Sequence, residues 1–183
     1  MIPGLMNQGQ SSIGSIRTHG CYFMCLMAIV QDVAGKLLSE PQIASVFSSG
    51  KQLRFIKDNA IPLGTAGWWR AFIEDGNGVI QLAAQELGIQ VKSGVLRDPL
   101  SPTPTGYPYT MIVLCATTQT DAGVVHKNWH YILGKVQPDL TWKETYDPGS
   151  GRFPRTNATG CRHWSVNQVR SPLFIKRDRR AIV

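Results

Sequence analysis

The sequence predicts a single α+β domain in which a helical N-terminal part packs on a mostly antiparallel sheet. The chain has 183 residues, a length that fits one domain with a sizeable core. Apolar residues recur at helical spacing in the first half, whereas the second half is rich in the β-branched and aromatic residues typical of strands. Helices first and strands second, without regular alternation, favour separate α and β parts over a parallel α/β sheet.

The N-terminal segment, residues 1–20, is rich in Gly, Ser, Asn and Gln. These residue types favour turns over regular elements. We therefore expect an extended or looped segment that leads into the first helix.

The helical part, residues 21–88, opens with ten consecutive apolar residues from Cys21 to Val30. This run is shorter than the roughly 18–20 residues that a membrane span requires. It also lacks the preceding basic stretch and the small-residue cleavage site of an export signal, so we expect no signal peptide. Its helical periodicity predicts a core helix instead. The positions on one face are Cys21, Met24, Cys25, Ala28, Ile29 and Val33.

Two more helices are predicted in this part. The second begins after Ser39, with a Glu-Pro pair in its first turn, and runs to about Phe47. The third, residues 79–87, follows an Asp-Gly-Asn-Gly turn and ends at Gly88, a residue that suits the left-handed position after a helix.

The sheet part, residues 89–176, contains segments with strand composition separated by Pro- and Gly-rich turns. The predicted strands are Ile89–Val95, Tyr109–Ala116, Trp129–Val136 and Thr141–Tyr146. Residues 98–104 are interpreted as a loop because of their prolines. A basic tail, residues 177–183, follows the sheet part.

The formal net charge of +7 is concentrated at the C-terminal end. Residues 162–183 carry six Lys/Arg against one Asp, a net charge of +5, so the first 161 residues carry only +2. We interpret the tail as a solvated terminus and do not expect nucleic-acid binding. The cysteines lie far apart or in apolar runs, which indicates reduced thiols rather than a disulfide scaffold. They are Cys21, Cys25, Cys115 and Cys161.

The last two predicted strands are joined through Pro138-Asp139, a pair that suits a type I turn. If the hairpin closes there, Val136 faces Thr141 and His130 lies opposite Asp147. Opposed residues of an antiparallel pair share a face, with β-carbons roughly 4.5–5.5 Å apart. The pairing would orient the imidazole and raise its basicity. The alternative is a cross-strand polar pair that only satisfies its own hydrogen bonds.

Cys21 is expected in the first turn of its helix, directly after Gly20. Unsatisfied N–H groups and the positive end of the helix dipole favour a thiolate there, so we expect a lowered pKa. Gly20 allows backbone or substrate to come close. Cys25, one turn later on the apolar face, is expected to be buried and inert.

In this chain order, the Gln-rich N-terminal segment, His19-Gly20-Cys21, Trp129–Gly134 and Tyr146-Asp147-Pro148 resemble a papain-like cysteine peptidase. The nearest branch is the bacteriocin-processing, double-glycine-leader type and its relatives in bacteria and phages. The resemblance covers residues 8–149. The chain has neither the longer cysteine motif of the transporter-linked members nor a transporter domain, which favours a stand-alone peptidase or amidase.

The resemblance implies a papain-like fold and a role for each matching residue. Cys21 would be the nucleophile, His130 the general base and acid, and Asp147 the residue that orients the imidazole. An upstream glutamine would stabilise the oxyanion together with the nucleophile's own N–H. Gln8 and Gln10 are the candidates, with Gln10 slightly preferred. This chemistry requires no cofactor.

Substrate contacts are expected near the nucleophile and from exposed aromatic residues. Two adjacent indoles cannot both point into one core, so Trp68 or Trp69 is a candidate lip of the binding site, with ordinary packing as the alternative. Gly20 and Trp129 are the other candidates because they adjoin Cys21 and His130.

Two alternative interpretations are a metal site and a protein without catalytic activity. Cys21/Cys25 and His126/His130 are each four residues apart, a spacing found in zinc sites on helices. The second pair lies in a loop that enters a strand, so we expect no metal site. The non-enzyme alternative is a catalytically silent papain-like component of a phage particle or secretion apparatus.

Peptidoglycan cross-links or stem peptides are the expected substrate, with a protein substrate next. Transpeptidation would use the same residues and is not distinguished from hydrolysis. We expect cytoplasmic synthesis, with delivery to the cell envelope by a phage or secretion device as an option.

Overall fold

The computed structural model describes residues 1–63, 66–95, 108–121, 124–139, 142–150 and 169–177. In order, the elements are a 3-10 helix η1 (Gln8–Gln10), helices α1 (Gly14–His19), α2 (Cys21–Ala34) and α3 (Glu40–Gln52), strands β1 (Ile56–Leu63) and β2 (Ala66–Ile73), helix α4 (Gly76–Glu86), and strands β3 (Val91–Val95), β4 (Tyr109–Asp121), β5 (Val124–Val136), β6 (Trp142–Tyr146) and β7 (Val169–Arg177). The expected α+β class is confirmed.

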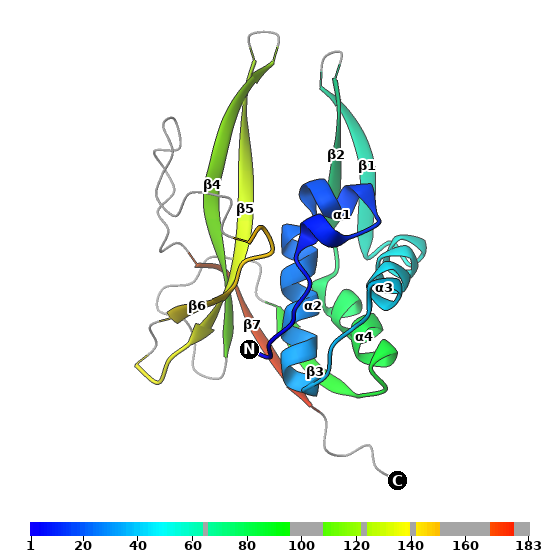
Figure 1. Cartoon of the computed structure of the whole chain (residues 1–183), viewed down its shortest axis with the longest axis vertical. Helices are drawn as coiled ribbons and strands as arrows, with labels where there is room; N and C mark the ends of the chain where they lie inside the picture. Colours follow the sequence, from blue (N-terminus) through cyan, green and yellow to red (C-terminus); the bar gives the residue numbers. More distant parts are fainter. Residues whose placement is uncertain (64–65, 96–107, 122–123, 140–141, 151–168, 178–183) are drawn as a thin grey trace.

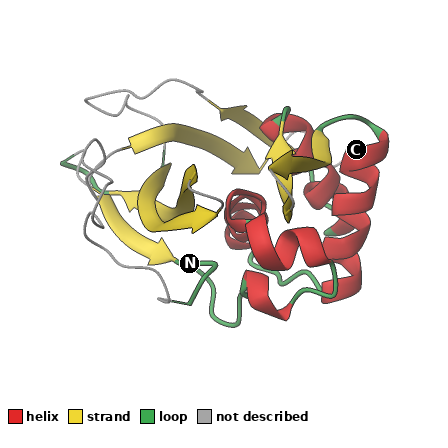
Figure 2. Ribbon diagram, turned by 90° about the horizontal axis from the view of Figure 1, so that it is seen from above, coloured by secondary structure: helices red, strands yellow, loops and turns green. Residues whose placement is uncertain are grey.

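The strands form two sheets. β1 and β2 make a separate antiparallel hairpin, and the other strands form a five-stranded sheet in the order β3-β7-β4-β5-β6. Every pairing within the described residues is antiparallel. The helices lie on one side of the molecule and the five-stranded sheet on the other (Figure 2).

Helix α2 occupies the centre, between the sheet and helices α3 and α4 (Figure 1). Its residues from Phe23 to Gln31 are all buried, so α2 is surrounded by protein rather than amphipathic. The predicted apolar face is buried except for the half-buried Val33. Burial on all sides between Phe23 and Val30 explains why this part of the helix has no polar face. None of the helices in the described part of the chain combines the length and hydrophobicity needed to cross a membrane.

The N-terminal segment is not simply extended or looped as expected, because η1 and α1 form within it. Ile16 of α1 is fully buried in the common core. The guanidinium of Arg17 donates to the carbonyl oxygens of Ser11 and Ser12 at 2.9 and 3.1 Å. Tertiary burial and these side-chain contacts stabilise a helix that composition alone did not predict.

The helical part also departs from the prediction, since the hairpin β1–β2 interrupts it. The strand β1 contains Asp58, Asn59 and Pro62, residue types that are depleted in strands. Helix α3 continues five residues beyond Phe47 and accommodates Gly50 in its last turn. A β-carbon at Gly50 would lie 2.7 Å from the Cδ1 of Ile56, so the glycine allows β1 to pack against α3.

The other helix ends follow local signals. Helix α4 begins three residues before its predicted start because the side chain of Asp75 accepts a hydrogen bond from the Gly78 N–H at 3.0 Å. Gly88 follows the helix with a φ of +65°, as expected for the left-handed position. Strand β7 was not predicted as an element, and its last residue, Arg177, was assigned to the basic tail. The predicted loop 98–104 and the tail from residue 178 lie outside the described residues.

Candidate functional site at the start of helix α2

His130 and Asp147 form a buried pair. The Nε2 of His130 lies 2.6 Å from the Oδ1 of Asp147, and the two side chains are 2% and 7% exposed. The same carboxylate oxygen accepts the N–H of Gly149 at 2.7 Å, and the Ser150 N–H donates to the Asp147 carbonyl at 3.0 Å. The turn after β6 therefore orients the carboxylate, and the carboxylate contacts the imidazole.

The contact was predicted, but the register behind it was wrong. Val136 pairs with Trp142 instead of Thr141, so the connection between β5 and β6 is one residue longer than expected. A bulge at Thr145 then shifts the register by one further residue.

Together the two shifts preserve the face on which each side chain lies, because side chains alternate along a strand with a period of two. By this register Asp147, just beyond the end of β6, lies across from Ile132. His130 is two residues farther along β5, on the same face. The carboxylate thus reaches the imidazole diagonally rather than from the directly opposed position.

Cys21 is the first residue of α2 and is 7% exposed. Burial raises the pKa of its thiol to about 11, hydrogen bonding to the backbone of Tyr131, of Tyr22 and of Cys21 itself lowers it in part, and the charge of Asp147 raises it further. The expected lowering of this pKa is therefore wrong. Loss of water around the sulfur outweighs the helix N-terminus.

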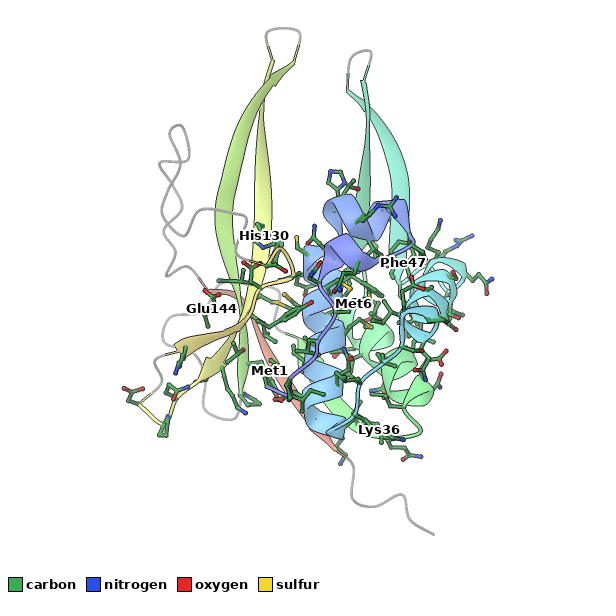
Figure 3. All side chains as sticks on the ribbon, in the orientation of Figure 1. Met1, Met6, Lys36, Phe47, His130 and Glu144 are labelled. Atoms are coloured by element: carbon green, nitrogen blue, oxygen red, sulfur yellow. The ribbon has the colours of Figure 1, made fainter. Side chains whose placement is uncertain are left out.

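Tyr131, the residue after His130, connects α2 to β5. The Sγ of Cys25 donates to the Tyr131 carbonyl oxygen at 3.7 Å, and the rings of Tyr22 and Tyr131 meet edge to face with centroids 5.1 Å apart. Through these contacts, the first turns of α2 dock on β5 one residue past His130. Figure 3 shows His130 on the side of β5 that faces α1 and the start of α2.

Cys25 has no exposed surface, and burial raises the pKa of its thiol well above the ordinary value, with the charges of Cys21 and Asp147 adding to the effect. The expected burial of Cys25 is confirmed, and its expected inertness stays a prediction. The side chains of Cys21, His130 and Asp147 are thus all buried.

Of the two candidate glutamines, the structure places Gln8 and not Gln10 beside these residues. The Gln8 N–H donates to the carbonyl oxygen of Pro148 at 2.9 Å, and its side chain, 3% exposed, donates from Nε2 to the Arg17 carbonyl at 3.2 Å. The side chain of Gln10 is exposed and accepts the N–H of Asn7 at 2.9 Å. The slight preference for Gln10 is thus not supported by the geometry.

The N-terminal segment joins the two halves next to the site. The Tyr146 hydroxyl donates to the Met6 carbonyl oxygen at 2.6 Å on the sheet side. On the helical side, the N–H and hydroxyl of Ser12 donate to the Glu40 Oε1 at 3.0 and 2.5 Å. Sequence reasoning missed Tyr146 and Tyr131 as positioning residues because their partners are more than 100 residues away.

Gly20 has a structural reason to be glycine. A β-carbon there would lie 2.6 Å from the Cα and the carbonyl oxygen of Ile16, so the close approach that Gly20 permits is that of α1. The expected approach of substrate is therefore not needed to explain this residue.

For the three candidate tryptophans, the structure describes only the backbone. Trp68 and Trp69 are adjacent in β2, where they pair with Ile61 and Ala60 and so belong to opposite faces of the hairpin. Trp129 precedes His130 in β5. Their side chains lie outside what the structure describes, so their predicted substrate contacts stay predictions.

Both long hairpins, β1–β2 and β4–β5, extend beyond the body of the molecule at the end where α1 lies (Figure 1).

No group of three or more His, Cys, Asp and Glu side chains that could hold a metal ion occurs among the described residues. His126 and His130 both lie in β5, where a spacing of four residues corresponds to about 13 Å along the strand. That distance is too long for two ligands of one ion. The helical spacing that suggested a zinc half-site therefore does not apply to this pair.

Comparison of the chain with protein-family models, with curated proteins and with solved structures gave no match.

Proposed function

We propose that the protein is a cysteine-dependent amide hydrolase of the papain-like type. The observation that carries the proposal is the buried His130–Asp147 contact of 2.6 Å, which lies one residue before Tyr131, the residue of β5 on which the first turns of α2 dock. A base and a group that orients it are thereby next to the start of the helix that carries the proposed nucleophile, Cys21.

In the proposed mechanism, Asp147 holds the Nε2 side of the imidazole, and the Nδ1 side takes the proton from Cys21. The sulfur attacks the amide carbonyl carbon, and the resulting oxyanion accepts hydrogen bonds from the Cys21 N–H and from the Gln8 Nε2. His130 returns the proton to the leaving amine, and a thioester remains. Water, deprotonated by His130, then attacks the thioester and releases the acid and the thiol.

The raised pKa of Cys21 fits this mechanism if the proton moves during attack. A neutral thiol is the favoured resting form in a buried site, because an isolated charge is costly there. Asp147 disfavours a thiolate when the imidazole is neutral, yet stabilises the imidazolium once it forms. In the proposed mechanism, the charge of Asp147 thus links loss of the proton from Cys21 to its gain by His130.

For the substrate, we propose amide bonds of peptidoglycan, in cross-links or stem peptides, with proteins as the second class. The concentration of positive charge at residues 162–183 supports an anionic polymer partner. Hydrolysis and transpeptidation differ only in whether water or an amine attacks the thioester, so the same residues serve both.

The direct test is to incubate the protein with peptidoglycan and with casein and to measure new amino termini. Wild type should release new termini from peptidoglycan, and Cys21→Ala should lower the rate by at least about a thousandfold. The matched control is Cys25→Ala, one turn later on the same helix, which should retain most of the activity. Cleavage by Cys21→Ala at the wild-type rate would end the assignment.

One observation favours a second function, that of a catalytically silent papain-like component of a phage particle or secretion apparatus. Cys21 is only 7% exposed and its pKa is raised to about 11, which suits a structural thiol. Labelling intact protein with a thiol probe, followed by peptide mass spectrometry, separates the two. The enzyme requires Cys21 to react much faster than Cys25, whereas equally slow labelling supports the structural component.

A further inference from the structure

Gln8 contains an orphan acceptor. Within the described residues, its Oε1 is the buried side-chain nitrogen or oxygen atom that lacks a hydrogen-bond partner. An unpaired acceptor shielded from water is unfavourable, and buried polar atoms nearly always have a partner. A partner from outside the chain would satisfy it.

The position of Gln8 is set at two points. Its backbone N–H donates to Pro148, the residue after Asp147, and its Nε2 donates to the carbonyl of Arg17, four residues before Cys21. Gln8 therefore connects the turn that carries the carboxylate, through its backbone, with the segment that leads into the thiol, through its side-chain amide.

The orientation of the amide follows from chemistry. If the group were turned over, Oε1 would face the Arg17 carbonyl oxygen, and two acceptors would meet at 3.2 Å. Nε2 is thus the atom that faces Arg17, and Oε1 remains the atom without a partner.

We propose that Gln8 Oε1 accepts an N–H of the substrate amide and makes the site selective for amides over esters. The inference rests on the proposed function and names its substrate class. An ester of the same shape has no N–H and would leave Oε1 unpaired, and such unpaired groups discriminate more strongly than missing apolar contacts. This acceptor role is separate from the donation by Nε2 to the oxyanion.

The experiment uses two small thiol reagents that differ in the N–H. Iodoacetamide carries an amide and methyl iodoacetate an ester, and both alkylate a thiol with loss of iodide. Their rates at Cys21 in the intact protein, followed by mass spectrometry, are divided by their rates with free cysteine. We expect a normalised preference for the amide of roughly three- to tenfold, the size of one hydrogen bond.

Two variants assign the preference to Oε1. Gln8→Met keeps the length of the side chain but removes the acceptor, and should bring the normalised ratio to about one. The matched control is Gln10→Met, two residues away and exposed, which should leave the ratio at the wild-type value. Thermal unfolding confirms that each variant is folded.

Two results would overturn the inference: a ratio near one in wild type, or a ratio unchanged in Gln8→Met. The absence of alkylation by either reagent would do so too, since neither could then reach the site. The proposed function is tested separately by His130→Ala, which should slow both reagents equally. An insensitive rate there contradicts the general base and leaves the ratio unaffected.

Discussion

The two ends of helix α2 both contact the sheet, yet they shift the pKa of an ionisable side chain in opposite directions. The pKa of Cys21 is raised, and that of Asp32 is lowered. At the start of the helix, the Cys25 Sγ donates to the Tyr131 carbonyl oxygen in β5, and the rings of Tyr22 and Tyr131 are in contact. At the other end, Asp32 accepts the hydroxyl of Tyr109 in β4 at 2.7 Å, and its carboxylate lies 3.2 Å from the N-terminal ammonium and 3.7 Å from the Nζ of Lys135.

Burial alone acts in the same direction at both ends. It raises the pKa of Asp32, but the Tyr109 hydroxyl, the N-terminal ammonium of Met1 and Lys135 outweigh it, so that the pKa of Asp32 is lowered. For Cys21 burial prevails and the pKa is raised. A carboxylate near a helix C-terminus opposes the helix dipole, so these partners also compensate for an unfavourable position.

Helix α2 thus has a charged carboxylate near one end and a neutral thiol at the other. The Tyr109 hydroxyl and the two cationic groups keep Asp32 ionised, in a structural role. At the thiol end, burial and the charge of Asp147 favour a neutral sulfur. The following predictions test this contrast, in order of decreasing expected effect.

The largest effect concerns the reactivity of Cys21 as a function of pH. Because its pKa is raised to about 11, alkylation by iodoacetamide should keep rising through pH 9 toward pH 11. At pH 7 the rate should lie about a hundredfold or more below that of free cysteine, whose pKa is about 8.5. The neutral thiol stabilises the fold fully below about pH 8.5, and this contribution is lost as pH rises toward 11.

Asp147→Asn sharpens this prediction. Removing the negative charge should move the alkylation profile of Cys21 to lower pH, because Asp147 raises the pKa of the thiol. If a preformed thiolate–imidazolium pair existed, the same variant would move the profile to higher pH, and the wild-type rate would level off near neutrality.

The next effect concerns Asp32. Asp32→Asn should lower the free energy of unfolding at pH 7 by about 1–3 kcal/mol, measured by urea denaturation, because the cationic partners lose a largely buried carboxylate. Since the pKa of Asp32 is lowered, its contribution is present above its unfolded pKa of about 4 and is lost as pH falls through the folded value. The difference between variant and wild type should therefore shrink below about pH 4.

The control for Asp32 is Glu74→Gln. Glu74 pairs with Lys57 at 3.2 Å, but both side chains are about half exposed. An exposed pair contributes little, so this variant should unfold at nearly the wild-type urea concentration. Equal losses of unfolding free energy in the two variants would mean that the ion pairs of Asp32 stabilise the end of α2 no more than an exposed pair does.

The smallest effect concerns the ring contact between Tyr22 and Tyr131. A double-mutant cycle with Tyr22→Leu and Tyr131→Leu should give a coupling of about 0.5–1.5 kcal/mol in the free energy of unfolding. The comparison pair is Phe23 and Phe47, which have the same edge-to-face geometry with centroids 5.4 Å apart but join α2 to α3.

The two ring pairs should differ in their effect on the site. The tyrosine variants should also change the alkylation rate of Cys21, because their rings dock α2 on β5 next to His130. The phenylalanine variants should lower stability without that change. A similar change of rate in both sets would mean that Tyr131 has no special positioning role.

Local signals were sufficient for much of the fold. The core helix beginning at Cys21, the helix after Ser39 and the stop at Gly88 follow from apolar spacing, capping and glycine conformation, all of which act within a few residues. The His130–Asp147 contact was also predictable, because the shift in turn length and the bulge together preserve the face of each strand. The papain-like assignment was neither confirmed nor contradicted.

What the sequence by itself determined about this protein is the α+β class, the positions of its main helices and the pairing of one imidazole with one carboxylate, since these depend on short-range periodicity. The tertiary structure decided the hairpin β1–β2, the position of Gln8 beside the turn after Asp147 and the raised pKa of Cys21. These depend on which distant segments exclude water from a group or supply its hydrogen bonds. Burial and charge pairing are sums over neighbours in space, and spacing along the chain does not specify them.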